Sequence, residues 1–493
     1  MISSLLNLKL NKSKKGFKVC VELITFIKKY LNSNKDIICL INDISKNTNI
    51  PKKILQDKLS QELFRSFDFK HNKFLGYEFI YSLKDFLKFY AIVLINIMGH
   101  VFLNFNNKEK KSFDLTCDNV FGQLDIKLYS NLIKFFNKTC LLGNYSPKKK
   151  IKSEYCFKYK LLLIGNTNTS FKEKFSFILL GVKILYLSIK NRTNLFSLFT
   201  LLIYDIFKSA HIFSKIKSKY YVTNKFYATS PILRFYFKKN GGKIYSCTQK
   251  NICAYSLSLF VFADVMFTLG KNQGKICNKL GGKINRFEPV GSFFMESSWF
   301  NKKIDSKKTL QSDILIVGVN TLFNNRHYVD SSYEKNYYGY FLSWIKKLCD
   351  DYPKKKIVIK HHGSYSIDPR EKKALKDLNI EFLIKDHRDN NSYALAFKSK
   401  FVISFSSTMI LEILGHGKKA YYLDPNLEGD YWYGDVKNIK QFRLGAYRDI
   451  KMKINNTKKN SWVNKSLTDN YCLDSRYTSK RIFDFLKNYN KTN

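Results

Sequence analysis

A turn rich in hydroxyl side chains follows the apolar run FVIS at residues 401–404. The run predicts a buried strand, and MILEIL after the turn predicts a helix. Hydroxyls and unpaired backbone N–H groups at a helix start can hold a phosphate; the alternative is an ordinary helix cap before a core helix. A carboxylate one turn further, Glu412, can accept hydrogen bonds from a ribose or sugar hydroxyl. The hydroxyl side chains of the turn are Ser404, Ser406, Ser407 and Thr408.

A second polar element, KHHG, overlaps the end of the apolar run KIVIK at residues 356–360. This run predicts another buried strand, which ends at Lys360 and places His362 just beyond it. A lysine and a histidine beside a pyrophosphate would stabilise the charge that develops on a leaving nucleotide. A lone histidine is more often an ordinary surface or core residue. The prediction of a phosphate contact for His362 therefore depends on the serine-rich turn further along the chain.

Strand and helix patterns alternate at short spacing through the last third of the chain. Such alternation predicts right-handed βαβ units and a parallel sheet, in which ligands bind beyond the carboxyl ends of the strands. The predicted strands cover residues 313–319, 356–360, 380–384, 401–404 and 420–423. The predicted helices cover residues 333–349, 369–378, 391–397 and 409–414.

A similar but less regular pattern starts near Tyr159. Pro231 is typical of a first helical turn, and Gly241 would end that helix. The polar, Lys-rich segment 301–310 predicts a linker between two lobes, and a helix at 475–488 is expected to pack back across them. The predicted strands cover residues 161–164, 219–222, 243–247, 261–269 and 286–290.

The chain has 493 residues, which fits two or three domains, and a formal net charge of +46. The charge predicts an anionic partner, such as a membrane surface or a phosphorylated substrate, unless a codon bias towards lysine explains it. Arg-rich motifs and zinc-finger spacings are absent from the sequence, so no nucleic-acid partner is expected. Ten cysteines without a CxxC pair fit a reduced, cytoplasmic compartment.

Two apolar stretches, at residues 86–105 and 195–207, could be mistaken for membrane spans. Neither has the roughly 20 apolar residues that a crossing helix needs. Buried helices are the plainer interpretation, and helices that rest on a membrane surface with lysines on their polar side are the alternative. We therefore expect a basic, largely helical N-terminal region, and a cytoplasmic protein that can lie peripherally on the inner face of the cell membrane.

The two polar elements together resemble the donor lobe of GT-B glycosyltransferases. The resemblance is to bacterial enzymes that build capsules, lipopolysaccharide and other surface polysaccharides, including sialyl-, Kdo- and polyol-phosphate transferases. In that family a K-x-H-P element and a later pair of hydroxyls contact the phosphates of the nucleotide donor. Lys360 and His362 match the first element, with Gly363 in place of the proline, and Ser406 and Ser407 match the second.

The resemblance implies roles for further residues. It assigns Glu412 to a ribose contact, and it assigns Arg326, in the loop after the first strand of the second lobe, to the donor phosphates. It implies no bound metal and no other cofactor. Upstream, Gly291 in EPVGS resembles part of a lobe-closing element and Asp264 in FADVMFTLG lies in a strand of the first lobe, so both residues are expected to be structural.

Inversion at an anomeric carbon needs a general base for the acceptor hydroxyl. This base is expected in the first lobe, across the cleft from the donor. Asp205, Asp264 and Glu288 are candidates, and their spacing selects none of them. The catalytic residue is therefore left open.

These observations predict an α/β fold of two Rossmann-like lobes, the GT-B arrangement, with an acceptor lobe at 1–300, a linker at 301–310, a donor lobe at 311–460 and a returning tail at 461–493. The predicted function is transfer of a sugar from a nucleotide-activated donor to a surface polysaccharide or lipid-linked glycan. The alternatives are a CDP-linked polyol-phosphate transferase and a non-catalytic, basic, membrane-associated binding protein with a decayed GT-B lobe. The expected donor-binding residues are Lys360, His362, Ser406, Ser407, Thr408, Glu412 and Arg326.

Overall fold

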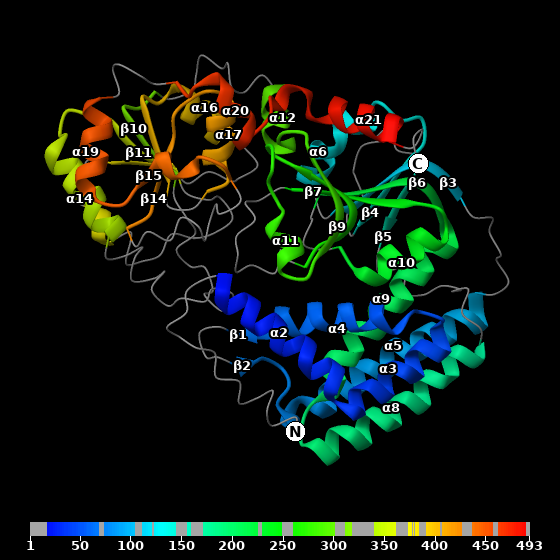
Figure 1. Ribbon diagram of the computed structural model, residues 1–493. Coiled ribbons are helices and arrows are strands. Elements are labelled where there is room, and N and C mark those ends of the chain that lie inside the picture. The colour runs from blue at the N-terminus through cyan, green and yellow to red at the C-terminus, as the bar shows by residue number, and fades with distance from the viewer. Residues whose placement is uncertain are drawn as a thin grey trace.

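A computed structural model of the chain contains two parallel β-sheets and a layer of long helices (Figure 1). It confirms the predicted α/β fold of two Rossmann-like lobes with a helical N-terminal region. The structure describes residues 17–68, 73–103, 111–120, 123–143, 155–158, 171–224, 229–248, 260–300, 311–317, 340–360, 373–376, 378, 380–383, 391–404, 407–425, 436–456 and 462–489.

The first sheet is parallel throughout its described strands, which lie in the order β5-β4-β3-β6-β7-β8-β9. Strand β8 is buried along its whole length, as expected for a parallel sheet that is covered by helices on both faces. The strands are β3 (Lys111–Val120), β4 (Thr139–Gly143), β5 (Tyr155–Lys158), β6 (Ile216–Thr223), β7 (Lys243–Cys247), β8 (Phe262–Thr268) and β9 (Lys283–Pro289).

The second sheet is also parallel, and its described strands lie in the order β12-β11-β10-β13-β14-β15. Its central strands are short runs of branched apolar residues that are buried on both faces. The strands are β10 (Ile314–Val317), β11 (Ile357–Lys360), β12 (Glu381–Leu383), β13 (Phe401–Ser404), β14 (Tyr421–Leu423) and β15 (Arg443–Leu444).

Helices follow the strands in both lobes, and their starts reflect local sequence. In the first lobe, the hydroxyl of Ser230 accepts a hydrogen bond from the N–H of Ile232, and Pro231 occupies the first turn of α10. First-lobe helices are α6 (Gln123–Ile133), α10 (Pro231–Lys239), α11 (Ile276–Lys279) and α12 (Phe293–Phe300). Second-lobe helices are α14 (Leu342–Asp351), α16 (Asn391–Lys398), α17 (Met409–Gly415), η7 (Ile439–Phe442), α19 (Tyr447–Asn455) and α20 (Lys465–Tyr471).

The end of the chain returns from the second lobe to the first. After η8 (Ser475–Tyr477), helix α21 (Thr478–Tyr489) packs against α6 and α12. Its buried Ile482 and Leu486 join the hydrophobic core on one face of the first sheet. These elements occupy the segment 475–488, where the sequence predicts a helix that packs back across the lobes.

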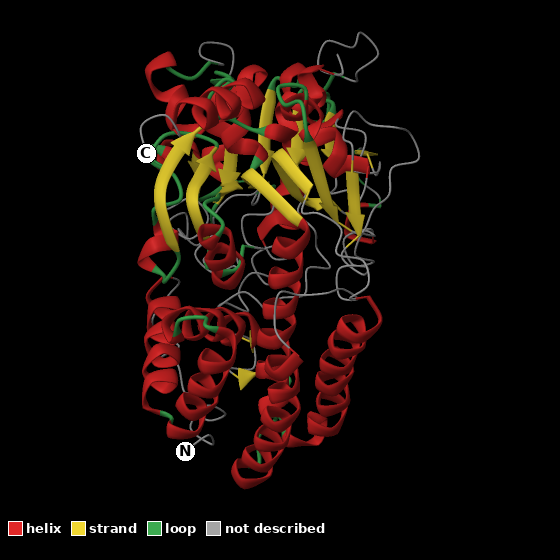
Figure 2. Cartoon of the chain, turned by 90° about the vertical axis from the view of Figure 1, so that its right-hand side faces the viewer, coloured by secondary structure: helices red, strands yellow, loops and turns green. Residues whose placement is uncertain are grey.

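Long helices cover the other face of the first sheet and extend below it in Figures 1 and 2. They share one hydrophobic core with that face of the sheet. A short hairpin of β1 (Phe67–Asp68) and β2 (Lys73–Phe74), followed by η1 (Phe79–Tyr81), interrupts them. The helices are α2 (Phe17–Ser33), α3 (Lys35–Thr48), α4 (Lys52–Ser66), α5 (Ser82–Leu103), α8 (Phe171–Asn191) and α9 (Leu195–Lys215).

The two apolar stretches noted in the sequence differ in burial. In the described part of the chain one helix, α9, is long and apolar enough to cross a bilayer, and 72% of its apolar window is buried within the protein. The helix continues to Lys215, so the expectation that this stretch is too short to cross a bilayer is wrong. Its burial is nevertheless typical of a core helix, as predicted for 195–207. Helix α5, which contains much of the stretch 86–105, is buried on one side only and exposes large apolar side chains on the other.

Most predicted elements agree with the structure to within a few residues. Strands β7 and β13 have the predicted bounds, and the helix predicted at 333–349 is described from its later part as α14. Of the helix predicted at 369–378, residues 373–375 are helical. The strand predicted at 161–164 and the linker predicted at 301–310 lie outside the described residues.

Candidate functional site

The order of strands in the second sheet creates a switch point between β10 and β13. The chain runs outward from β10 to β11 and β12, and then returns to the other side of β10 as β13. In open parallel sheets, ligands bind beyond the carboxyl ends of the strands at such a switch point. Val317 is in register with Lys360 on β11 and with Ser404 on β13, so these residues share that edge.

The structure places part of the predicted donor site at this edge. Lys360 is buried at the end of β11, and the Ser404 hydroxyl donates a hydrogen bond to the Val317 carbonyl oxygen at 3.1 Å. Ser407 and Thr408, three and four residues after Ser404, are half-buried, and the Ser407 hydroxyl accepts a hydrogen bond from the Met409 N–H at 3.3 Å. Of the other four predicted residues, Glu412 is described, whereas His362, Ser406 and Arg326 lie outside the described residues.

Helix α17, which follows the serine-rich turn, has only seven residues. A helix this short has a small macrodipole, so its N-terminus contributes less to phosphate binding than the sequence interpretation assumed. Lys360, Ser407 and Thr408 are the predicted donor residues that the structure describes at this edge. Their assignment to the donor nucleotide stays a prediction.

Glu412 is placed differently from the expectation of a ribose contact. Its carboxylate is buried and accepts hydrogen bonds from the hydroxyl of Ser292 and, at 2.8 Å, from that of Tyr393. Burial raises the pKa of Glu412, against the lowering effect of these two hydrogen bonds. The contact of the buried Glu412 carboxylate with Ser292 connects the lobes, and the ribose contact stays a prediction.

The contact between Glu412 and Ser292 brings the carboxyl edges of the two sheets together. Ser292 follows the carboxyl end of β9 in the first sheet, and Glu412 lies in the helix after β13 in the second. Other interlobe hydrogen bonds support this orientation: the Gln273 amide donates to the carbonyl oxygens of Asn470 and Tyr471 at 2.8 and 2.7 Å. The carboxyl edges of both sheets therefore meet at the same interlobe region.

The first sheet has its own switch point, between β3 and β6, and sequence reasoning missed it. Asp118, near the end of β3, is in register with Thr223 at the end of β6, and it is buried. It lies beside Tyr221, whose pKa is raised by burial and by this carboxylate. The alternation of apolar residues in KSFDLTCDNV at 111–120 could have predicted the strand, although not its central place in the sheet.

The three carboxylates proposed as general bases are held by structural partners. Asp205 accepts a hydrogen bond from the Ser230 hydroxyl and pairs with Lys58 at 3.2 Å; although burial opposes it, Lys58 lowers the pKa of Asp205. Asp264 is buried against Arg234 at 2.8 Å, in agreement with its predicted structural role. Glu288 pairs with Arg286, two residues before it on β9, at 2.9 Å.

Gly291 also has the structural role that the sequence predicts. Its φ of +99° lies in the region that favours glycine. An added Cβ would stand 2.8 Å from the Thr478 hydroxyl, so the chain can pass here only without a side chain.

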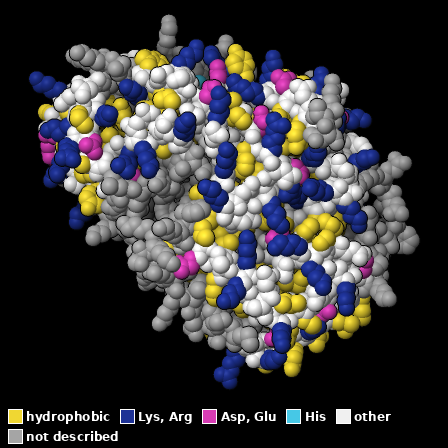
Figure 3. Space-filling view, viewed as in Figure 1, with side chains coloured by type: hydrophobic (Ala, Val, Ile, Leu, Met, Phe, Trp, Pro, Cys, Tyr) yellow, Lys and Arg dark blue, Asp and Glu magenta, His cyan; other side chains and the backbone are white. Residues whose placement is uncertain are grey.

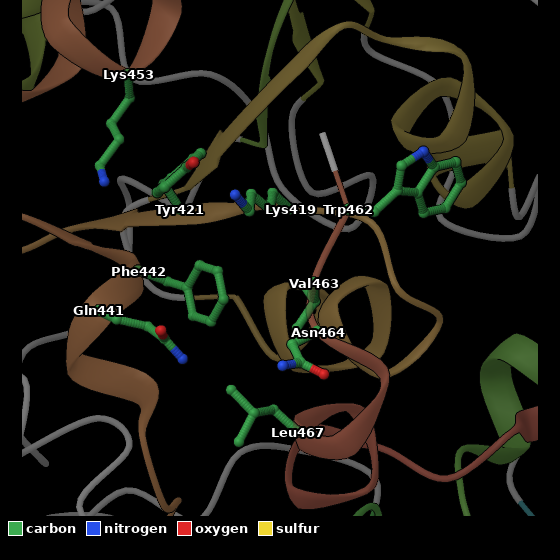
Figure 4. Close-up of a pocket in the computed structure, with 9 residues that line it drawn as sticks. All are labelled: Lys419, Tyr421, Gln441, Phe442, Lys453, Trp462, Val463, Asn464 and Leu467. Atoms are coloured by element: carbon green, nitrogen blue, oxygen red, sulfur yellow. The ribbon is translucent and has the colours of Figure 1, made fainter. Parts of the chain in front are cut away.

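A pocket of about 440 Å³ lies elsewhere in the second lobe (Figure 4). Lys419 and Tyr421 line it from the amino end of β14, and Trp462 lies at its side. In a parallel sheet this is the edge opposite to the one that carries Lys360 and Ser404. The pocket is therefore separate from the candidate donor site.

No protein-family model matches the sequence, and no curated protein is similar to it in sequence. Among solved structures, the S. aureus MnaA–UDP co-structure is similar with a TM-score of 0.45 and 14% identity, over 77% of this chain and 97% of that one. A UDP-GlcNAc 2-epimerase from Neisseria meningitidis bound to UDP-GlcNAc is similar with a TM-score of 0.44 and 12% identity, over 77% of this chain and 100% of that one. The T4 phage β-glucosyltransferase is similar with a TM-score of 0.28 and 9% identity, over 77% of this chain and 98% of that one. Similarities this weak leave the fold to be established by the sheet topology and say nothing of the activity.

Proposed function

We propose that the chain is a glycosyltransferase that binds a nucleotide-activated sugar at the carboxyl edge of the second sheet and its acceptor at the carboxyl edge of the first. The observation that supports this most is the contact between Glu412 and Ser292, because it brings the two carboxyl edges to one place. A donor on one edge and an acceptor on the other would then face each other, with the reacting atoms between them.

On the donor side, the positive charge of Lys360 and the hydroxyls of Ser407 and Thr408 suit a pyrophosphate. Charge grows on the leaving nucleotide as its bond to the anomeric carbon breaks, so cations and hydroxyl donors at this edge stabilise the transition state more than the ground state. His362 and Ser406 belong to the same two segments and complete this donor site in the proposal.

On the acceptor side, we assign the general base to Asp118. It is buried near the carboxyl end of β3, at the switch point of the first sheet. In the reaction, the acceptor hydroxyl oxygen forms a bond to the anomeric carbon, the bond to the nucleotide phosphate breaks, and the hydroxyl proton passes to the carboxylate. No metal enters this scheme.

A titration with CMP-, UDP- and GDP-linked sugars tests the donor site. We expect one of them to bind, and we expect His362→Ala and Ser407→Ala each to weaken binding roughly tenfold or more, because each removes a hydrogen bond to a charged phosphate. Ser466→Ala, at an exposed serine of α20 in the same lobe, is the control and should bind as the parent does. If no such donor binds, or if both variants bind normally, the proposed donor site is wrong.

Turnover with acceptor glycans tests the reaction. Transfer of a sugar adds a sugar mass to the acceptor and releases the nucleotide, whereas polyol-phosphate transfer adds a phosphorus-containing mass. An epimerase would change the donor without changing its mass, and a binding protein would leave both substrates intact. Asp118→Asn should lower turnover by about a hundredfold and leave the donor affinity unchanged. Asp114→Asn, in the first half of β3, is the control and should leave turnover unchanged.

A further inference from the structure

Helix α8 exposes a continuous apolar strip. Five large side chains follow one another at intervals of three or four residues, which places them on one face of a helix. Each is between 50% and 64% exposed, although apolar residues of this size are normally buried in a helix that packs on a core. These side chains are Phe175, Leu179, Val182, Tyr186 and Ile189.

Helix α5 and the turn before it carry a second strip with the same property. Its side chains are between 40% and 82% exposed, while the opposite side of α5 places Phe89 and Val93 in the core. Helix α5 is thus apolar on both sides, and one of these sides is exposed in the monomer. The exposed side chains are Ile80, Leu83, Leu87, Leu94, Ile95 and Met98.

The two helices lie side by side in opposite directions. The Tyr90 hydroxyl donates a hydrogen bond to the Ile178 carbonyl oxygen at 3.0 Å near the middle of both helices, and Glu78 bridges to Thr193 where α5 begins and α8 has ended. Gly181 of α8 lies against Tyr90, which keeps the helix axes close. The two strips therefore form one surface, which we call the α5–α8 face.

Cations accompany the α5–α8 face. Lys84 and Lys88 are exposed on α5, at helical positions beside the apolar strip. Lys190, near the end of α8, and Arg192, just after it, are exposed near the start of α5. Lys190 lies 3.7 Å from Asp36, and Lys183 is paired with Asp43 at 2.5 Å. Figure 3 shows lysine and arginine side chains among apolar ones over these N-terminal helices at the lower right.

We propose that the α5–α8 face docks the protein on the surface of an anionic lipid bilayer. Apolar side chains on one plane with lysines at their side are the pattern of helices that lie in a membrane interface, where the chains enter the acyl boundary and the lysines contact headgroups. The inner sides of both helices are packed on protein, so they lie on the bilayer and do not cross it. A second copy of the chain is disfavoured as the occupant, because two molecules with a net charge of +46 repel each other.

Sedimentation with vesicles tests the proposal, using phosphatidylcholine vesicles with and without phosphatidylglycerol. We expect binding to the anionic vesicles, weakened by salt and much weaker without phosphatidylglycerol. Leu83→Glu combined with Leu179→Glu should reduce binding roughly tenfold or more, because each places a carboxylate against the acyl boundary. Lys84→Gln combined with Lys88→Gln should reduce binding to the vesicles with phosphatidylglycerol and leave binding to those without it unchanged.

The matched control is Met452→Glu, which alters a comparably exposed apolar side chain on α19 of the second lobe and should bind as the parent does. All substituted residues are exposed, so the thermal unfolding of the variants should equal that of the parent. The proposal is overturned if the parent does not bind anionic vesicles, if Met452→Glu loses as much binding as the double variant, or if light scattering shows a dimer that Leu83→Glu with Leu179→Glu dissociates.

Discussion

At the scale of single residues, Glu296 makes the folded protein sensitive to pH. It lies in α12 of the first lobe, is buried, and accepts hydrogen bonds from the N–H and hydroxyl of Ser479 at 2.8 and 2.5 Å. Burial raises its pKa from 4.5 to about 7. The folded protein therefore binds this proton more tightly than the unfolded chain, and the stability that the proton contributes is lost as the pH rises from 4.5 to 7.

We expect Glu296→Gln to remove this loss. The free energy of unfolding of the parent should fall by up to about 3 kcal/mol between pH 4.5 and 7 because of Glu296, and the variant should lack this part of the decline. Urea unfolding at several pH values measures the difference. Asp484→Asn, at an exposed carboxylate of α21, is the control and should retain the parent's profile. Parallel profiles for the parent and Glu296→Gln would contradict the assignment.

At the scale of elements, the structure shows which features a sequence pattern can predict. Strands such as β7 and β13 were predictable because a short apolar run between turn residues needs no knowledge of its neighbours. The partners of Glu412 were not predictable, since Ser292 lies 120 residues away and meets it only after both lobes have folded. Asp118 was missed for the same reason, because strand order alone places it at a switch point.

The contact between α17 and α20 depends on a glycine. At Gly415, the last residue of α17, an added Cβ would lie within 2.7 Å of the Cys472 Cα. Gly415→Ala should therefore force the helices apart and lower the free energy of unfolding by roughly 1–3 kcal/mol, as overpacked sites do. Lys465→Ala, at the exposed start of α20, should leave it nearly unchanged. Equal unfolding curves for Gly415→Ala and the parent would show that the second lobe absorbs the added methyl group.

At the scale of the whole molecule, the chain order and the spatial order differ at the C-terminus. Helix α21 follows the second lobe in sequence, yet its apolar side belongs to the core of the first. Between the two lobes, the Asp474 carboxylate accepts a hydrogen bond from the Arg476 side chain. The backbone carbonyl oxygen of Asp474 accepts a hydrogen bond from the Arg481 side chain at 2.6 Å. The His416 side chain and Arg476 lower the pKa of Asp474, against the effect of its burial. Ser475 in this segment joins the lobes, because its N–H donates to the His416 ring at 3.1 Å and its hydroxyl accepts from the Ser292 N–H at 3.1 Å.

A substitution in the apolar side of α21 should therefore destabilise the first lobe. Ile482→Ala with Leu486→Ala removes two fully buried side chains, and each deletion of this kind costs about 2–5 kcal/mol. Helix α6, more than three hundred residues earlier in sequence but in contact with α21, should then exchange its amide hydrogens faster. Lys487→Ala, exposed on the same helix, should leave α6 unchanged. Faster exchange confined to the second lobe would contradict the role of α21 as part of the first lobe's core, because the lost apolar contacts lie on the first sheet alone.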